Sequence, residues 1–308
     1  MRTITRLEEL ADESAPIVFT AGAFDGVHRG HQVVFQHARE RAASMGGQVW
    51  ALTFDPHPLK ILRPEKAPAL LTSTPHRLQL LRDQNIAGVA MLPFTPAFAA
   101  QEPEEFIETV HDAVPVLRAF VVGSNWTFGR GARGNVTLLD ELGMRLNFEV
   151  DTVPRVTWQG APISSTRIRQ AIIDGRLEDA AEMLGRPFDI YGTVVHGAKL
   201  GRKLGFPTAN VDPHNEVRPP PGIYASVVRV DGVEYVAAAF LPAHPDPRKG
   251  PADVIEVHLL DAALDLYDQD INLRFVRKLR DEQKFNGVEE AKAQIARDVS
   301  AVRALCNA

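Results

Sequence analysis

The sequence predicts an α/β domain followed by a small antiparallel β-barrel. In the first part of the chain, short apolar runs alternate with helical patterns, which is typical of a parallel sheet covered by helices on both faces. After about Gly185 the texture changes to closely spaced strand-like runs separated by glycine and proline turns, as in small barrels. We therefore expect a Rossmann-like N-terminal domain over residues 1–186 and a β-barrel domain with a C-terminal helix over residues 187–308.

Composition limits the function classes. The chain has 308 residues, of which 45% are hydrophobic and 24% charged, a balance typical of globular domains. The net charge of −5 argues against nucleic-acid binding through a basic surface. A single cysteine, Cys306, excludes an internal disulfide and a thiolate zinc site. No apolar run reaches the roughly 20 residues of a membrane span, and the N-terminus lacks the apolar run of a signal peptide, so we expect a cytoplasmic protein.

The first part of the chain contains five apolar runs of strand length. They cover residues 17–20, 49–54, 89–94, 119–123 and 148–153. Helices are expected over 30–44, 102–112, 135–145, 165–174 and 177–184, and another begins near Thr74, where Pro75 suits a first helical position. Parallel sheets bind ligands beyond the carboxyl ends of their strands. The residues after the first run therefore lie where a ligand site is expected.

The second part contains five further strand-like runs. They cover residues 190–195, 222–230, 234–239, 254–260 and 271–276. Glycine and proline turns separate them, and only residues 288–305 show a clear helical period. This arrangement favours a barrel with a terminal helix packed against it.

The turn after the first strand has the features of an anion site. His28 and His31 are three residues apart where the chain enters a helix, so both side chains lie on one face. The helix start offers free N–H groups, and glycines let the backbone approach a ligand. Nucleotidyl transfer needs such donors, because negative charge builds on the α-phosphate. The alternative, a glycine-rich turn with two incidental histidines, is disfavoured by their spacing.

A second segment, at 163–169, places three hydroxyl side chains at a helix start. They belong to Ser164, Ser165 and Thr166, and Arg169 follows one turn later. Hydroxyls and backbone donors at a helix N-terminus bind phosphate, and an arginine fork adds charge. The plainer interpretation of the hydroxyls taken alone is ordinary helix capping.

The most informative stretch of the second half covers residues 196–210. Its glycines, among them Gly201 and Gly205, and its basic residues suit a phosphate-binding loop. Thr208 and Asn210 offer hard oxygen ligands of the kind that Mg²⁺ prefers. It is not a Walker loop, because the Gly-Lys-Ser/Thr ending is absent. From chemistry alone, a basic hairpin turn is the safer interpretation.

These segments together resemble a known family. The motif FDGVHRGH at 24–31 and the motif ISSTRIR at 163–169 resemble the nucleotidylyltransferases with the HxGH signature. With TFDPHP at 53–58 and VGSNWTFG at 122–129 added, the chain is similar to the bacterial bifunctional riboflavin kinase/FMN adenylyltransferases, also called FAD synthetases. The resemblance covers nearly the whole chain, with its motifs in the family's order.

For the N-terminal half the resemblance implies transfer of an adenylyl group from ATP to FMN, which gives FAD and pyrophosphate. It implies that His28 and His31 are catalytic. The residues implied in binding ATP and its phosphates are Gly22, Phe24, Asp25, Asn125, Ser164, Ser165, Thr166 and Arg169. For Asn125, a simple turn residue at a strand end is the alternative.

For the C-terminal half the resemblance implies phosphorylation of riboflavin by ATP. The motif LGRKLGFPTAN at 200–210 resembles the riboflavin kinase signature, in which Thr208 and Asn210 hold Mg-ATP. The two glycines of the motif that are implied in ATP binding are Gly201 and Gly205. ATP, riboflavin and FMN are thus the implied small-molecule substrates, and Mg²⁺ is expected to serve both halves. The resemblance implies no nucleic-acid or membrane partner.

Two further kinase residues follow from the resemblance. Glu256 falls at the family's proposed catalytic base, where a carboxylate accepts the proton of the riboflavin 5′-hydroxyl as it attacks the γ-phosphate. The alternative is a strand glutamate that faces solvent. Arg280 is implied to help close the flavin pocket.

One segment departs from the family pattern. Residues 237–245 lack the glycine and the Pro-Thr pair that the family carries there, and Asp268 stands where members typically have glycine. The leading hypothesis is an enzyme with both activities. The alternative is an FMN adenylyltransferase only, whose barrel is a flavin-binding or regulatory module.

Overall fold

A computed structural model describes residues 1–197, 205–243, 254–262 and 264–306. Its internal contacts divide the chain into two compact units. The first comprises Met1–Ala69 and Thr74–Ser165, and the second comprises Leu70–Ser73 and Thr166–Ala308. The expected α/β architecture and the expected barrel are both confirmed. The expected domain boundary between residues 186 and 187 stays a prediction.

The first unit is built on a six-stranded sheet in which every described strand pair is parallel. Its order is β1-β4-β3-β2-β5-β6. The strands are β1 (Arg2–Ile4), β2 (Ile17–Ala21), β3 (Gln48–Asp55), β4 (Gly88–Pro93), β5 (Leu117–Gly123) and β6 (Glu149–Val153). Strands β2 to β6 confirm the five apolar runs. Strand β1 was not expected, because only one of its three residues, Ile4, is buried and no apolar run marks it.

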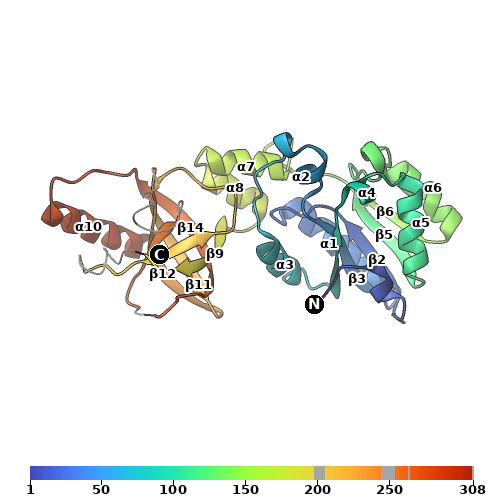
Figure 1. The fold of residues 1–308 in the computed structure, drawn as a ribbon, viewed down its shortest axis with the longest axis horizontal. Helices are drawn as coiled ribbons and strands as arrows, with labels where there is room; N and C mark the ends of the chain where they lie inside the picture. The colour runs from blue at the N-terminus through green and yellow to red at the C-terminus, as the bar shows by residue number, and fades with distance from the viewer. Residues whose placement is uncertain (198–204, 244–253, 263, 307–308) are drawn as a thin grey trace. The chain divides into compact units, whose positions relative to one another are not determined.

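Helices cover both faces of this sheet (Figure 1). The main ones are α1 (Arg29–Ser44), α3 (Thr74–Arg82), α5 (Pro103–Ala113) and α6 (Val136–Leu146). Short helical turns are η1 (Leu7–Leu10), α2 (Pro58–Leu62), η2 (Pro64–Lys66), α4 (Pro96–Ala99) and η3 (Arg130–Ala132). One apolar cluster joins β2 to α1 and α3, and another joins β2 to α5 and α6. All five residues of β2 are buried, which explains why it appears in the sequence as a continuous apolar run.

The order of the strands marks one position on the sheet as special. From β2 the chain builds outward through β3 and β4 on one side, whereas β5 and β6 lie on the other. The order therefore reverses between β2 and β5, and open α/β sheets bind ligands outside the carboxyl ends of the strands at such a switch point. The segment that leaves β2 there runs from Gly22 to His28. Topology thus places the histidine turn where a ligand site is expected.

The second unit is a closed six-stranded antiparallel barrel of order β10-β13-β12-β11-β14-β9. Its strands are β9 (Asp189–Val195), β10 (Ala209–Pro213), β11 (Gly222–Val230), β12 (Val233–Leu241), β13 (Ile255–Leu259) and β14 (Asp270–Arg280). Five match the expected runs. Strand β10 was not expected, because its short alternation of buried Val211 and Pro213 with polar residues resembles a loop.

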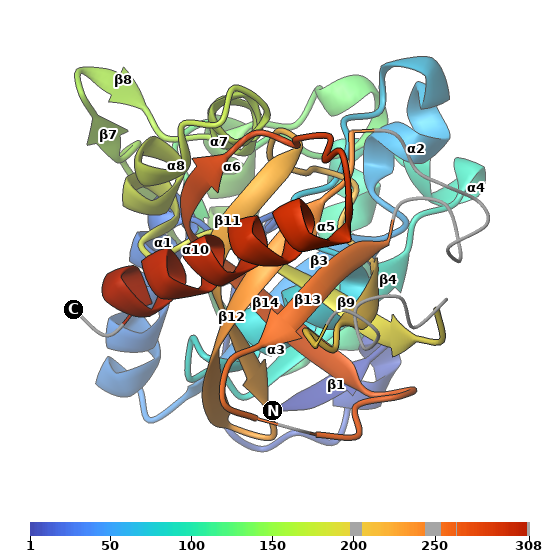
Figure 2. The ribbon, with the colours of Figure 1, turned by 90° about the vertical axis from the view of Figure 1, so that its left-hand side faces the viewer.

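Three helices accompany the barrel among the residues that the structure describes. Helix α7 (Ser165–Ile173) and α8 (Leu177–Leu184) precede it, after a small hairpin of β7 (Thr157–Trp158) and β8 (Ala161–Pro162). Helix α10 (Val288–Cys306) lies across the outside of the barrel, where it packs on β11, β12 and β14 (Figure 2). Among the residues that the structure describes, no helix has the length and apolar character needed to cross a membrane.

The barrel strands alternate between interior and exterior residues. In β13, Ile255, Val257 and Leu259 are buried, whereas Glu256 and His258 are only half-buried. Because successive strand residues point to opposite faces, Glu256 and His258 lie on the outer face of the barrel. The interior of the barrel is filled mainly with apolar side chains. The two polar residues of β13 therefore lie on the outside of the barrel.

Candidate active sites

The turn between β2 and α1 has an unusual backbone. Phe24 and Val27 have φ values of 51° and 39°, in the left-handed region that non-glycine residues rarely occupy. Gly26, between them, has a φ of 80°. Such strain persists only where the surroundings fix it, and it is concentrated at functional sites. The turn begins with Gly22, whose N–H donates to the carbonyl of Leu52 at 3.1 Å.

The two histidines form a stacked pair at the start of α1. His28 is the N-cap residue, and its Nδ1 accepts a hydrogen bond from the backbone N–H of His31 at 3.4 Å. The two ring centroids are 3.7 Å apart, with the ring planes at 15°. Phe24 packs its ring edge-on against His31, with centroids 5.2 Å apart. A Cβ at Gly30 would lie 3.1 Å from the His28 ring, so glycine there lets the ring keep this position.

The environment of His31 keeps its imidazole neutral. Burial, and secondarily the neighbouring His28, lower the pKa of His31 well below 6.5. Nδ1 of His31 is buried and has no hydrogen-bond partner among the described residues. A neutral imidazole still carries one N–H donor. The stacked pair can therefore offer a donor to an anionic ligand near neutral pH without holding two adjacent positive charges.

A residue that sequence reasoning missed, Arg77 on α3, supports this turn. Its side chain is buried, and Nη1 donates to the carbonyl of Ala23 while Nη2 donates to the carbonyl of Phe54, both at 3.0 Å. Burial lowers the pKa of Arg77, whereas the charges of Asp55 and Asp25 raise it. The guanidinium thus joins the turn after β2 to the end of β3. The signal in the sequence is a charged residue on the buried face of a helix.

The other expected residues of this half are placed as follows. Asp25 lies in the turn and is buried, and its carbonyl accepts from the Ser165 hydroxyl at 3.0 Å. This bond brings the first residue of α7 to the histidine turn. Asn125 is exposed two residues after β5, the strand beside β2. Ser164 directly precedes α7, whereas Thr166 and Arg169 lie within it and belong to the second unit.

A cavity of about 360 Å³ lies on the outer face of the barrel. Thr208, Glu256 and Arg280, three residues singled out from the sequence, line it together. Its other walls are mainly apolar and include the rings of Phe206 and Phe240. A mostly apolar cavity with a few convergent polar groups is typical of small-molecule sites. The structure thus collects in one place residues that lie far apart in the sequence.

Asn210 lies next to this cavity. It is the cross-strand partner of Glu256 in the pairing of β10 with β13, so the two side chains share the outer face. A Cβ at Gly197 would lie 2.2 Å from Nδ2 of Asn210, which shows how closely the amide approaches the β9 end. Gly205 is described and has a φ of 88°. Gly201 lies outside the described residues.

His258 is a second residue that sequence reasoning missed. It lines the cavity two residues after Glu256, and its Nδ1 lies 2.8 Å from the carbonyl oxygen of Pro207. Its ring also meets Phe206 edge-on, with centroids 5.6 Å apart. His258 therefore holds the backbone before Thr208 against β13. The alternation of Glu256 and His258 with apolar residues in the strand could have indicated that both lie on the same face.

Comparison with known proteins identifies relatives for both units. The family model of FAD synthetase matches residues 10–167, and that of riboflavin kinase matches residues 184–306. The bifunctional riboflavin kinase/FMN adenylyltransferase of Escherichia coli K12 is 38% identical over 97% of this chain and 95% of that protein. The protein of the same name from Pseudomonas fluorescens is 36% identical over 99% of this chain and 98% of that protein.

A solved structure resembles the whole chain. It is described as a macrolide-efflux protein from Streptococcus pneumoniae, with a TM-score of 0.83, 28% sequence identity, and 98% of each chain covered. The arrangement of an α/β unit followed by a barrel therefore exists in an experimentally determined fold.

We predict that Arg77→Met destabilises the first unit by about 2–4 kcal/mol, because it removes one donor from each of the carbonyls of Ala23 and Phe54, together with the charge that faces Asp25 and Asp55. Arg77→Lys should cost less. All 3 tryptophans, at positions 50, 126 and 158, belong to this unit, so their fluorescence during urea unfolding of the full chain measures its stability. Arg39→Met is the control, since Arg39 makes one described hydrogen bond and should change stability by less than about 1 kcal/mol. Equal effects of both methionine variants would contradict the role given to Arg77.

A second prediction concerns pH. Because the folded-state pKa of His31 lies well below 6.5, the unfolded chain binds this proton first as the pH falls. The stability of the first unit should therefore decrease below about pH 6.5, by up to about 1.4 kcal/mol per pH unit, with no contribution from His31 at higher pH. Urea unfolding at pH 7.5, 6.5 and 5.5, followed by tryptophan fluorescence, tests this. His31→Gln should flatten the profile, and parallel profiles of variant and wild type would refute the lowered pKa.

Proposed function

The chain belongs to the family of bifunctional riboflavin kinase/FMN adenylyltransferases, and we propose that it makes FAD from riboflavin in two ATP-dependent steps. The barrel unit phosphorylates riboflavin to FMN. The first unit then transfers an adenylyl group from a second ATP to FMN and releases pyrophosphate. The observation that carries the proposal is that each half of the chain matches its own enzyme family and contains a candidate site, the stacked histidines in one half and the cavity with Glu256 in the other.

In the adenylyl transfer, a phosphate oxygen of FMN attacks the α-phosphorus of ATP. The attacking group is already an anion, so the site needs to stabilise charge rather than remove a proton. We assign this stabilisation to His28, His31 and the positive end of the helix dipole at the start of α1. A neutral His31 suits the role, because it donates a hydrogen bond without requiring protonation in a buried place.

The remaining residues of this half are assigned to ATP. The hydroxyl and guanidinium groups that we propose for its phosphates are those of Ser164, Ser165, Thr166 and Arg169. Gly22, Phe24, Asp25 and Asn125 are proposed to bind the nucleotide at the switch point of the sheet. The bond from Ser165 to the Asp25 carbonyl supports this grouping, because it joins the two segments that carry the motif residues.

In the kinase step, the 5′-hydroxyl of riboflavin attacks the γ-phosphorus of ATP, the bond from that phosphorus to the bridging oxygen breaks, and ADP leaves. We propose that Glu256 accepts the hydroxyl proton, because its side chain is half-buried and lines the cavity together with Thr208. Gly201 and Gly205 are proposed to contact the ATP phosphates. The cavity offers apolar and aromatic walls of the kind that a flavin ring requires.

Mg²⁺ is proposed as the metal cofactor of both steps. In the barrel, the hydroxyl of Thr208 and the amide oxygen of Asn210 fit a hard cation, and they lie on neighbouring positions of one outer face. Among the described residues, no three His, Cys, Asp or Glu side chains gather into a metal-binding group. This donor set suits an ion held mainly by phosphates, whose charge the bound ion neutralises.

The alternative, adenylyl transfer alone, rests on the altered segment 237–245. Its first residues continue strand β12, and Ala238, Ala239 and Phe240 line the cavity, whereas residues 244 and 245 lie outside the described residues. The small and aromatic side chains of this segment are compatible with a bound flavin ring. The relatives named for both activities match nearly the whole chain, which favours the two-step function.

We also propose a cytoplasmic location, with ATP, riboflavin and FMN as the small-molecule partners. Support comes from the single free cysteine, Cys306, which suits a reducing compartment. The acidic net charge of −5 supports a protein without a nucleic-acid partner.

We predict that the two activities can be removed separately. His31→Ala should abolish FAD formation from FMN and ATP, and FMN formation from riboflavin should continue. Glu256→Gln should lower FMN formation by about 100-fold or more and leave FAD formation from added FMN unchanged. Chromatography of riboflavin, FMN and FAD, together with a pyrophosphate assay, measures both steps.

His37→Ala is the matched control for the first variant, since His37 is an exposed residue of the same helix and should leave both activities intact. Equal loss of both activities in His31→Ala would contradict the assignment of two sites. Wild-type protein that converts FMN to FAD but makes no FMN from riboflavin and Mg-ATP would favour the alternative function.

A further inference from the structure

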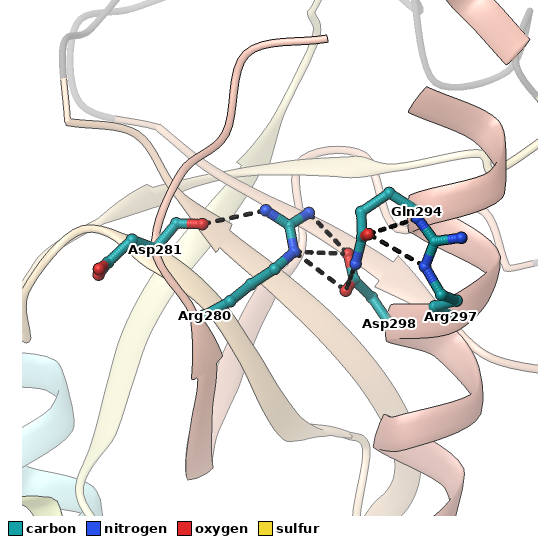
Figure 3. Close-up of polar contacts among 5 residues, drawn as sticks. All are labelled: Arg280, Asp281, Gln294, Arg297 and Asp298. Atoms are coloured by element: carbon teal, nitrogen blue, oxygen red, sulfur yellow. Dashed lines mark hydrogen bonds and ion pairs between the residues drawn. The ribbon is translucent and has the colours of Figure 1, made fainter. Parts of the chain in front are cut away.

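An ion pair between the half-buried Arg280 and the buried Asp298 forms part of the cavity wall in the barrel unit (Figure 3). Arg280 is the last residue of β14, and its Nε lies 3.0 and 3.2 Å from the two carboxylate oxygens of Asp298. Nη2 of Arg280 donates to Oδ2 of Asp298 at 2.7 Å. Asp298 is a residue of α10 and is only 7% exposed. The pair therefore joins the end of a barrel strand to the helix that covers the cavity.

A chain of hydrogen bonds holds the carboxylate in place. Gln294, one turn earlier on α10, donates from Nε2 to Oδ1 of Asp298 at 2.9 Å. Arg297 in turn donates to Oε1 of Gln294 from Nε at 3.1 Å and from Nη2 at 2.6 Å. Figure 3 shows the hydrogen bonds running from Arg297 through Gln294 and Asp298, all on α10, to the guanidinium of Arg280 on β14. The helix thus fixes the position of the carboxylate before any ligand binds.

The guanidinium of Arg280 keeps capacity for a ligand. Nη1 donates to the carbonyl of Asp281 at 3.0 Å, in addition to the bonds from Nε and Nη2 to Asp298. A guanidinium has five N–H groups, and these described bonds use three of them, one on each nitrogen. One N–H on Nη1 and one on Nη2 therefore remain to donate. Because Arg280 lines the cavity, a bound molecule is their natural acceptor.

Packing alone does not explain a charged pair at this place. The other α10 residues that line the cavity are Ala291, Ile295 and Val299, all apolar. A buried ion pair is often no more stabilising than apolar side chains of similar volume. Helix α10 also has an ion pair away from the cavity, where Arg303 lies 2.6 Å from the exposed Asp261. Attachment of the helix therefore does not require a buried charge in the cavity wall.

We propose that Asp298 is a positioning residue for flavin recognition, acting by orienting the guanidinium of Arg280 in the cavity wall. This rests on the proposed riboflavin kinase function of the barrel. Because Asp298 already neutralises Arg280, the remaining N–H groups suit a neutral acceptor, such as a ring carbonyl of riboflavin, better than a phosphate of ATP. The ion pair therefore contributes to affinity for the flavin and not for the nucleotide.

Asp298→Asn tests the proposal, with Asp261→Asn as the matched control. The first variant should raise the riboflavin KM and the riboflavin Kd by about 5- to 10-fold and leave the ATP KM and kcat within about twofold. The second removes an exposed ion pair of the same helix and should leave all four constants unchanged. Equal shifts in both variants, or an equal rise in the ATP KM, would overturn the proposal.

A double-mutant cycle separates positioning from a general structural role. If Asp298 acts through Arg280, adding Asp298→Asn to Arg280→Met should not raise the riboflavin Kd beyond that of Arg280→Met alone. Independent effects of the two substitutions, each multiplying the Kd, would contradict the assigned role.

A milder variant covers the case in which Asp298→Asn does not fold, as judged by circular dichroism. Gln294→Ala removes one support of the carboxylate and keeps the ion pair, so it should raise the riboflavin Kd by about 2- to 3-fold. An unchanged Kd in folded Gln294→Ala would then reject the proposal.

Measuring riboflavin binding directly separates a failure of the role of Asp298 from a failure of the proposed kinase function. Quenching of riboflavin fluorescence by the full chain, without ATP, gives the Kd independently of phosphoryl transfer. A wild-type chain that binds no riboflavin would reject the kinase function itself, whereas a wild-type chain that binds it with the same Kd as Asp298→Asn would reject only the role of Asp298.

Discussion

Close packing of apolar side chains fills the interior of both units, and this constraint decides where each site can lie. In the first unit the central strands are buried on both faces, as β2 shows with five buried residues out of five. Functional groups are therefore confined to the carboxyl edge of the sheet, and the reversal of strand order at β2 and β5 selects one point on that edge. In the second unit the barrel is too narrow for a ligand once its inward side chains are packed, so its cavity lies outside, beside α10.

The backbone of the histidine turn is strained, and this strain costs conformational free energy. Two non-glycine residues, Phe24 and Val27, are held at positive φ, and such conformations typically cost about 1–3 kcal/mol each. Both are buried, and Phe24 packs against Phe35 with ring centroids 4.9 Å apart. Arg77 adds one hydrogen bond to the carbonyl of Ala23 in the turn and one to that of Phe54 in the neighbouring strand β3. These contacts offset the strain and fix the two imidazoles in a stacked pair before a ligand arrives.

The sequence was sufficient for elements and motifs that depend on local pattern. Apolar runs located β2 to β6, and the spacing of His28 and His31 placed both on one side of a helix start. Strand β10 was missed because only alternate residues of five are apolar, and one of its outward positions, Asn210, is a polar ligand candidate. The cavity could not be located from spacing, since Thr208, Glu256 and Arg280 meet only through the pairing of strands and the closure of the barrel.

The partners of two arginines could not be predicted from the sequence either, because they also meet only in the folded chain. Arg77 reaches a carbonyl 54 residues away in the chain, and Arg280 reaches a carboxylate 18 residues away. Neither pairing follows from a period of two or 3.6 residues.

Both arginines nevertheless follow one physical rule. Each uses the planar fork of its guanidinium to join two segments at fixed angles, which the single ammonium of lysine cannot do. Removing such a charge from water is costly unless hydrogen bonds compensate it. Arg77 is compensated by two carbonyl oxygens and the nearby charges of Asp25 and Asp55, and Arg280 by Asp298. Apolar packing holds most of both units together, and these two guanidinium groups add hydrogen bonds of fixed direction between segments beside the candidate sites.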